Sequence, residues 1–210
     1  MEEIKNQISI ATTELYRVFN EFNVKYFDSE LIEPIIIIQS SGKHKNTNGW
    51  CTNYKAWSNE EELSRKFEIT MTAEYLNRPI YNVMGTQLHE MIHLYCTANN
   101  IVDCSNNNRY HNKKFKEEAE KRGLIIEHAK TIGWSVTTLT EETKQFIDSL
   151  NIKQDAFKFF RELPIAKEKE VKGKSKTLKY ECPTCHIEIK SKEEVKVLCQ
   201  KCNVLFTLKN

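Results

Sequence analysis

Long apolar runs are missing from this sequence. No stretch approaches the roughly 18 to 20 apolar residues that a helix needs to cross a bilayer. The N-terminus, MEEIKNQISI, also lacks the basic start and apolar core of a secretion signal. We therefore expect no membrane partner and a cytoplasmic location. Because thiols stay reduced there, the seven cysteines are expected to be thiols or metal ligands rather than disulfides.

The composition lacks an extreme bias. Apolar residues make up 40% of the 210 residues and charged residues 29%, which argues against a disordered chain or a fibrous repeat. This length suits one domain of ordinary size with a small additional module. The net charge of +2 is unevenly divided, because residues 1–165 hold 20 Lys and Arg against 23 Asp and Glu, whereas residues 166–210 hold 11 Lys against 6 Glu. The basic excess lies in the tail.

Apolar spacing predicts an α+β domain over residues 1–165. Apolar positions from Ile8 to Tyr26 recur at helical intervals without Pro or Gly and predict a long amphipathic helix. The apolar run 35–38 predicts a buried strand, and the alternation over 67–71 predicts a half-buried strand. Residues 42–62 are rich in polar and turn residues and indicate a loop or hairpin. Further helices are predicted at about 79–99, 111–122, 140–150 and 152–163.

Residues 88–94, LHEMIHL, contain the motif HExxH. Helix positions four apart differ by about 40° around the axis, so the imidazoles of His89 and His93 can reach one ion, with Glu90 beside them. Histidine and glutamate are also common on a solvated helix face, but the apolar neighbours on both sides of this motif are unusual there. We predict a zinc ion bound by the two histidines, with Glu90 as the general base that takes a proton from water.

The third protein ligand of a catalytic zinc separates the metalloprotease families. A metzincin would have Gly and His where this sequence has Cys96 and Asn99, so that family is excluded. A thermolysin-like site would use a downstream glutamate, and Glu117, Glu118 and Glu120 are available. Their spacing is more typical of the charged face of the predicted helix 111–122.

His111 is the other candidate for the third ligand. It lies 18 residues after His93, at the predicted start of the helix 111–122, so the intervening loop can fold it back onto the first pair. Phe115, one turn later, is expected to anchor that helix in the core. Taken with HExxH at this spacing, His111 is favoured as a zinc ligand over a polar residue at a helix start.

These motifs resemble the SprT-like (Spartan-type) family of zinc metalloproteases. The resemblance rests on LHEMIH, on a histidine of the HxxxF type and on a C-terminal cysteine module, and it covers roughly residues 5–165. The family often has Gly on both sides of the third histidine, where this sequence has Tyr110 and Asn112. The resemblance implies a zincin-like catalytic domain with a small sheet. It also implies an endopeptidase that cleaves DNA-associated or DNA-crosslinked proteins, with a role in DNA repair.

Two further features of the active site are expected. The oxyanion of the reaction needs a hydrogen-bond donor, for which Tyr110 and Tyr95 are candidates between which the sequence does not choose. By analogy with other zincin clefts, the strand over 67–72 is expected to bind an extended protein substrate by edge pairing.

The last four cysteines form two CxxC pairs separated by 13 residues: Cys182 with Cys185, and Cys199 with Cys202. Four thiolates make a closed tetrahedral zinc site, which would fold a segment too short to have its own core. Residues 180–210 are therefore predicted to form a zinc ribbon with a structural zinc, and a redox role is the alternative. Cys51, Cys96 and Cys104 are expected to be small buried apolar residues.

The tail also carries the predicted DNA-binding groups. Residues 166–179 are rich in Lys and poor in large apolar residues, which indicates a solvated linker. Tyr180 and Phe206 are candidates for stacking on bases, although a solvated surface is the alternative for all these groups. His44 and His128 are expected to be surface or capping residues. The lysines expected to contact phosphates are Lys190, Lys192, Lys196 and Lys201.

Three functions compete. The leading hypothesis is the zinc endopeptidase acting on proteins near DNA. The second is a nucleic-acid-binding or regulatory zinc protein with a non-proteolytic metal site, against which Glu90 argues because a structural site needs no base. The third is a metallopeptidase that does not depend on DNA, in which the ribbon docks on the catalytic domain or binds protein.

Overall fold

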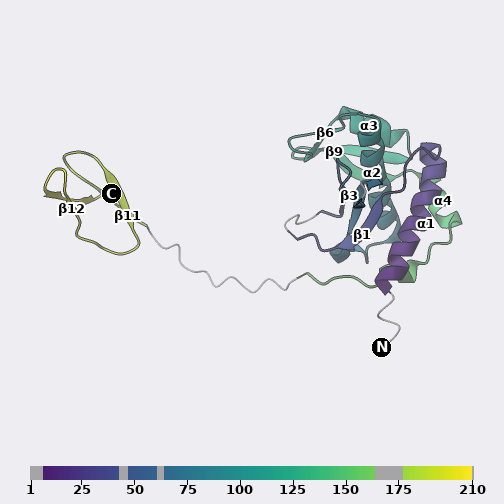
Figure 1. Cartoon of the computed structure of the whole chain (residues 1–210), viewed down its shortest axis with the longest axis horizontal. Coiled ribbons are helices and arrows are strands. Elements are labelled where there is room, and N and C mark those ends of the chain that lie inside the picture. The colour runs from purple at the N-terminus through teal and green to yellow at the C-terminus, as the bar shows by residue number, and fades with distance from the viewer. Residues whose placement is uncertain (1–6, 43–46, 61–63, 164–176, 210) are drawn as a thin grey trace. The chain divides into compact units, whose positions relative to one another are not determined.

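The computed structural model describes residues 7–42, 47–60, 64–163 and 177–209. The chain separates into two compact units, Met1–Leu163 and Pro164–Asn210, and each is described by itself (Figure 1). The predicted linker 166–179, except for its last three residues, lies outside the described residues, as does His44. No helix in the described ranges is long and apolar enough to span a membrane.

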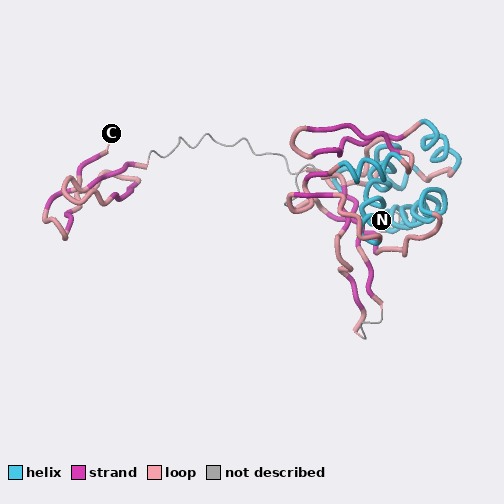
Figure 2. The backbone as a smooth tube through the Cα atoms, turned by 90° about the horizontal axis from the view of Figure 1, so that it is seen from above, coloured by secondary structure: helices cyan, strands magenta, loops and turns pink. Residues whose placement is uncertain are grey.

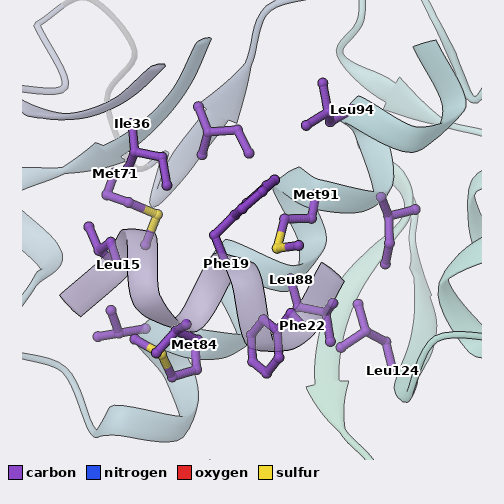
Figure 3. Close-up of a cluster of buried hydrophobic side chains, with 14 of the residues drawn as sticks. Leu15, Phe19, Phe22, Ile36, Met71, Met84, Leu88, Met91, Leu94 and Leu124 are labelled. Carbon is purple, nitrogen blue, oxygen red and sulfur yellow. The ribbon is translucent and has the colours of Figure 1, made fainter. Parts of the chain in front are cut away.

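Two long helices form the core of the first unit. The helix α1 (Gln7–Phe27) confirms the predicted N-terminal helix and lies along one side of the unit (Figure 1). Its buried stripe packs against α2 (Ile80–Ala98), which confirms the predicted helix 79–99. Figure 3 shows the apolar side chains of the two helices facing each other: Leu15, Phe19 and Phe22 from α1, and Met84, Leu88 and Met91 from α2.

The first sheet has the order β1-β5-β2, formed by β1 (Ile35–Gln39), β5 (Glu68–Thr72) and β2 (Gly49–Cys51). β1 is parallel to β5, and β2 is antiparallel to it. The strand predicted over 67–71 is confirmed as β5, but it is not half-buried, because β5 is central and is buried from Ile69 to Thr72. Its polar side chains are satisfied internally; the Thr72 hydroxyl, for example, donates to the Thr47 carbonyl at 2.7 Å. The predicted edge pairing by β5 is wrong for the same reason, and among the described strands none covers the other side of β2.

The predicted loop or hairpin 42–62 contains β2 and the first strand of a short hairpin. This hairpin pairs β3 (Trp57–Ser58) with β4 (Arg65–Lys66) in antiparallel fashion and extends away from the rest of the first unit (Figure 2). The two tryptophans of this region therefore lie in strands, with Trp50 in β2 and Trp57 in β3.

The helices at the end of the first unit are only partly as predicted. The helix α4 (Glu141–Ser149) confirms the prediction over 140–150, and the Thr140 hydroxyl caps its N-terminus. The predicted helix 152–163 is wrong, since the structure has only the 3₁₀ turn η3 (Gln154–Phe157) there. The chain is instead held by contacts with other elements, because the Arg161 N–H donates to the Ala73 carbonyl in a second 3₁₀ turn, η2 (Ala73–Tyr75).

The second sheet contacts α2 through β9 (Gly133–Leu139), where Leu139 lies against Gly85 and Thr137 bonds to His89, and it was not predicted. Its order is β6-β7-β9-β8, from β6 (Cys104–Ser105), β7 (Tyr110–His111), β9 and β8 (Leu124–Ala129). The helix α3 (Lys113–Glu120) is shorter than the predicted helix 111–122, which was expected to begin at His111. Instead His111 lies in β7, because the Asn112 side chain accepts hydrogen bonds from the N–H groups of Lys114 and Phe115 and so caps the helix.

The second unit is built from short strands. One sheet joins β10 (Leu178–Glu181), β11 (Glu188–Ser191) and β14 (Thr207–Leu208), and another joins β12 (Leu198–Cys199) with β13 (Val204–Leu205). Tyr180 is 6% exposed, and its hydroxyl accepts a hydrogen bond from the Val195 N–H. The expectation that Tyr180 stacks on bases is therefore wrong, since its ring fills the small core of this unit.

Candidate metal centre and active-site groove

Three histidines from two elements converge on one point. His89 and His93 lie one turn apart on α2, and His111 comes from β7. The Nε2 atom of His89 lies 3.2 Å from Nε2 of His93 and 3.2 Å from Nε2 of His111. The Nε2 atoms of His93 and His111 are 3.0 Å apart. Nitrogen ligands at tetrahedral angles around zinc would be about 3.3 Å apart. The cluster therefore has the size of one zinc site.

The opposite ring nitrogens fix how these imidazoles are oriented. Each Nδ1 has its own partner: Thr137 Oγ1 at 2.8 Å for His89, Asp103 Oδ2 at 2.6 Å for His93, and the Ile132 carbonyl at 3.3 Å for His111. A carboxylate and a carbonyl only accept hydrogen bonds, so Nδ1 carries the proton in His93 and His111. The Thr137 hydroxyl donates to the Ser135 carbonyl and so accepts from His89. When the rings are neutral, with the protons on Nδ1, the Nε2 lone pairs face one another, as metal ligation requires.

Phe115 forms the floor of this cluster. Its ring centroid lies 4.6 Å from those of His89 and His93 and 4.7 Å from that of His111, and the side chain is fully buried. The expectation that this residue anchors α3 in the core is confirmed. Because the same ring contacts all three imidazoles, it also excludes water from their inner side.

Glu90 belongs to α2, and its side chain packs against Gly49 of β2. Its carboxylate is buried, and burial raises the pKa of this carboxyl to about 7. Gly49 makes the close approach of β2 possible, since a Cβ at this position would lie 2.8 Å from the Thr70 carbonyl oxygen and 3.0 Å from Cγ2 of Thr86. The glutamate is thus held at a fixed place beside the histidines.

The three imidazoles differ in basicity without a metal. Burial lowers the pKa of His93, but its hydrogen bond to Asp103 outweighs this effect and raises the value to about 10. Burial lowers the pKa of His111 to about 4 and that of His89 well below its ordinary range. Two of the three rings are therefore neutral at pH 7, and the carboxylate of Asp103 compensates the charge of the third.

An open groove of about 1380 Å³ crosses the cluster. Its walls come from β2 on one side and from β9 on the other, with α2 between them. The acidic residues of its lining are Glu90 and Asp103, both at the histidines, whereas Arg78, Arg109 and Lys144 also line the groove. The histidine cluster is thus reachable by a chain laid along the groove.

Comparison with known protein families agrees with the motifs. The profile of the SprT-like family matches residues 15–140, which is more than half of the chain. This protein belongs to the SprT-like family. The match includes the histidine cluster and most of the groove, but not the cysteine unit. No curated protein and no solved structure matches the chain.

The two tyrosines expected as oxyanion donors in this SprT-like chain do not line the groove. The Tyr110 hydroxyl lies 3.1 Å from Nε2 of His128. Tyr95 packs in the core beneath the guanidinium of Arg122, 3.8 Å from its ring centroid, and against Phe27. Tyr110 contacts His128 and Tyr95 packs in the core, and the choice of an oxyanion donor between them stays a prediction. His128 is exposed, which confirms it as a surface residue.

The glutamates considered as a third ligand lie elsewhere on α3. Glu118 is bound by Lys121 and Arg122, and Glu120 pairs with Lys116. Within the described residues, the group of possible ligands around the histidines contains no glutamate of this helix. The thermolysin-like arrangement therefore has no support in the SprT-like unit.

The isolated cysteines divide into two kinds. Cys96 is fully buried, which confirms the expectation of a small core residue. Cys51 and Cys104 are only half-buried and line the groove, and Cys104 Sγ lies 4.0 Å from Nδ1 of His93. For Cys104 the expectation of a core residue is wrong, because β6 lies at the edge of the groove, whereas Cys51 also packs against the core and meets the expectation in part.

The second unit contains a separate cluster of four sulfur atoms, which lie within 4.8 Å of one another: those of Cys182, Cys185, Cys199 and Cys202. Each CxxC turn is followed by a residue with positive φ, His186 at 59° and Asn203 at 53°. The N–H groups of these two residues donate to the carbonyls of the first cysteine of each pair, at 2.9 and 2.7 Å. Two like turns that present four thiols fit a zinc ribbon.

Proposed function

We propose that this protein is a zinc-dependent endopeptidase. The observation that carries the proposal is the convergence of three Nε2 atoms beside a buried glutamate in an open groove. A structural zinc site would need four closed ligands and no base, whereas this one has three nitrogens and Glu90. Membership of the SprT-like family supports a metalloprotease.

The residues of the centre have distinct tasks in this proposal. His89, His93 and His111 hold the zinc, and Asp103 orients and stabilises His93 through Nδ1. When bound, zinc polarises the scissile carbonyl and lowers the pKa of a water molecule. Glu90 accepts the proton of the attacking water and passes it to the leaving amine, a task that suits a carboxyl with a pKa of about 7.

The substrate is an extended polypeptide that pairs with β2. This strand lines the groove directly beside Glu90, and no described strand covers its outer edge. An extended chain added there forms backbone hydrogen bonds that do not depend on its sequence. Such binding suits an enzyme that cuts many different proteins in unfolded segments.

The cysteine unit is proposed to hold a second, structural zinc and to bind DNA. Its exposed cations include Lys190, Lys192, Lys196 and Lys201. Lys209 is not counted with them, because it is bound by the carboxylates of Glu181 and Glu188. Lysines without a carboxylate partner are free to contact phosphates. In this arrangement residues 1–165 cleave proteins, residues 180–210 bring the enzyme to DNA in the cytoplasm, and residues 166–179 connect the two.

The test is to incubate the zinc-loaded protein with a DNA-binding protein in the absence of DNA, with single-stranded DNA and with double-stranded DNA. Cleavage that requires DNA supports the full proposal. Cleavage that is equal in all three conditions supports a metallopeptidase that does not depend on DNA. Binding of DNA without cleavage, in wild type as in Glu90→Gln, supports a non-proteolytic zinc protein and overturns the proposal.

A further inference from the structure

Arg78 lines the groove immediately before the start of α2. Its Nε donates to the Tyr75 carbonyl at 2.8 Å, and its Nη2 donates to the Thr86 hydroxyl at 2.9 Å. These bonds fix the plane of the guanidinium but use only two of the five N–H donors of an arginine. The remaining donors belong to the end of the side chain, where a planar carboxylate can bind in a bidentate manner.

This arginine differs from the other buried or half-buried arginines of the described ranges. Arg17 pairs with Glu14 and Arg122 pairs with Glu118. Among the described residues no carboxylate forms an ion pair with Arg78, and burial lowers the pKa of its guanidinium. Removing a charge from water without a counter-charge is unfavourable. An anionic ligand would compensate this cost.

The position of Arg78 relates it to the proposed base. Thr86, its hydrogen-bond partner, precedes Glu90 by four residues on the same face of α2, which is about 6 Å along the helix axis. An extended peptide advances about 3.3 Å per residue, so this distance corresponds to one or two residues of substrate. Tyr81 and Lys144 also line the groove, and neither would repel a carboxylate.

We propose that Arg78 forms a subsite for a carboxylate of the peptide substrate, one or two residues from the bond that is cut. The carboxylate belongs either to an acidic side chain or to the free C-terminus of the substrate. This inference rests on the proposed peptidase function. In the competing explanation, Arg78 only fastens the turn at 75–78 to α2 and contacts no substrate.

The experiment compares peptides that differ at single positions near the scissile bond. Each position carries Glu, Gln or Lys in turn, and each peptide is made with a free and with an amidated C-terminus. For the full-length zinc-loaded protein we expect kcat/KM to be higher for Glu than for Gln by about tenfold or more at one position. A gain that instead follows the free C-terminus assigns the subsite to the terminal carboxylate. Binding of the same labelled peptides to Glu90→Gln, measured by fluorescence anisotropy, gives the preference without turnover.

Variants separate the subsite from a structural role. In Arg78→Gln the ratio between the Glu and Gln peptides should fall towards one, and in Arg78→Glu the Lys peptide should become the preferred one. Lys144→Gln is the matched control, because this cation of the same groove already pairs with Glu141 at 3.2 Å, so the preference should remain. An equal loss for all peptides in Arg78→Glu would mean a structural role and overturn the inference.

The comparison among peptides requires no variant, so it remains decisive if the Arg78 variants fold poorly. Wild-type protein that cuts Glu, Gln and Lys peptides equally well, with free or amidated ends, removes the subsite but leaves the peptidase function intact. Wild-type protein that neither cuts nor binds any of these peptides, or any unfolded protein, overturns the proposed function and the subsite together.

Discussion

Gly133 offers the sharpest test of how the third histidine is held. It begins β9 with φ at +72°, and it pairs with His111 of β7. A Cβ added at Gly133 would lie 2.1 Å from the carbonyl oxygen of His111 and 2.9 Å from Cε1 of Tyr110, whereas ordinary contact begins at 3.4 Å. In Gly133→Ala, β7 must therefore retreat by about 1.3 Å, because the obstacle is backbone and cannot rotate away.

That displacement acts directly on the metal centre. The His111 N–H donates to the Ile132 carbonyl at 3.0 Å, and the same carbonyl accepts from the imidazole. A shift of this size takes Nε2 of His111 out of its cluster with His89 and His93. We expect zinc affinity at this centre to fall by about tenfold to a hundredfold, as when an outer partner of a ligand is lost. Proteolysis should fall in parallel.

Gly42→Ala is the matched control. Gly42 also has positive φ, at +52°, but a Cβ there meets only the Ser40 carbonyl oxygen, at 4.0 Å. Both variants bear the cost of about 1 kcal/mol for a left-handed alanine, and only Gly133→Ala adds the clash. Zinc content per chain, zinc competition with a chelator and denaturant unfolding should be measured for both. Wild-type zinc affinity in Gly133→Ala would refute this account of how His111 is positioned.

Three other variants test the remaining assignments. Glu90→Gln should keep both zinc ions and lose proteolysis, because the amide packs alike but cannot accept a proton; full activity in a cleavage assay removes Glu90 from its role. His111→Ala should lose the catalytic zinc and activity, whereas Glu117→Ala should change neither; the opposite metal contents would indicate a thermolysin-like site. Truncation near Val171 should leave one zinc per chain and an intact catalytic fold, and DNA affinity should fall. Unchanged DNA affinity, with unchanged salt dependence, would assign DNA contact to the first unit.

Local patterns in the sequence predicted the helical half of the site. The i,i+4 spacing of His89 and His93 and the apolar stripe of α2 are properties of a single helix, so they could be read without knowing the rest of the fold. The motif identified His111 as the third histidine, but the sequence placed it in a helix rather than in the strand β7. The reason is that Asn112 caps α3, so the helix begins after His111.

The partners that orient the histidines could not be predicted in the same way. Thr137 and Ile132 reach the site only because β9 pairs with β8 and β7, and such pairing joins residues far apart in the sequence. The alternating segment 124–139 is a signal that could have revealed the hairpin. The sequence indicates Asp103 as a partner of the histidines less clearly, because it is only one acidic residue in the polar loop between the predicted ligands His93 and His111. β5 is central because β1 and β2 pair with its two edges. The alternation of apolar and polar residues within β5 does not predict that pairing.

The third histidine, the helix cap and the aromatic floor belong to one short segment, since His111, Asn112 and Phe115 follow one another within five residues. Metal binding and the ordering of this segment are therefore parts of a single equilibrium, in which each stabilises the other. Chelation should then raise amide hydrogen exchange in α3 more than in α1, which carries no ligand. The occupancy of the centre would in this way set the local stability of the segment, and available zinc would govern how readily the protein itself is degraded.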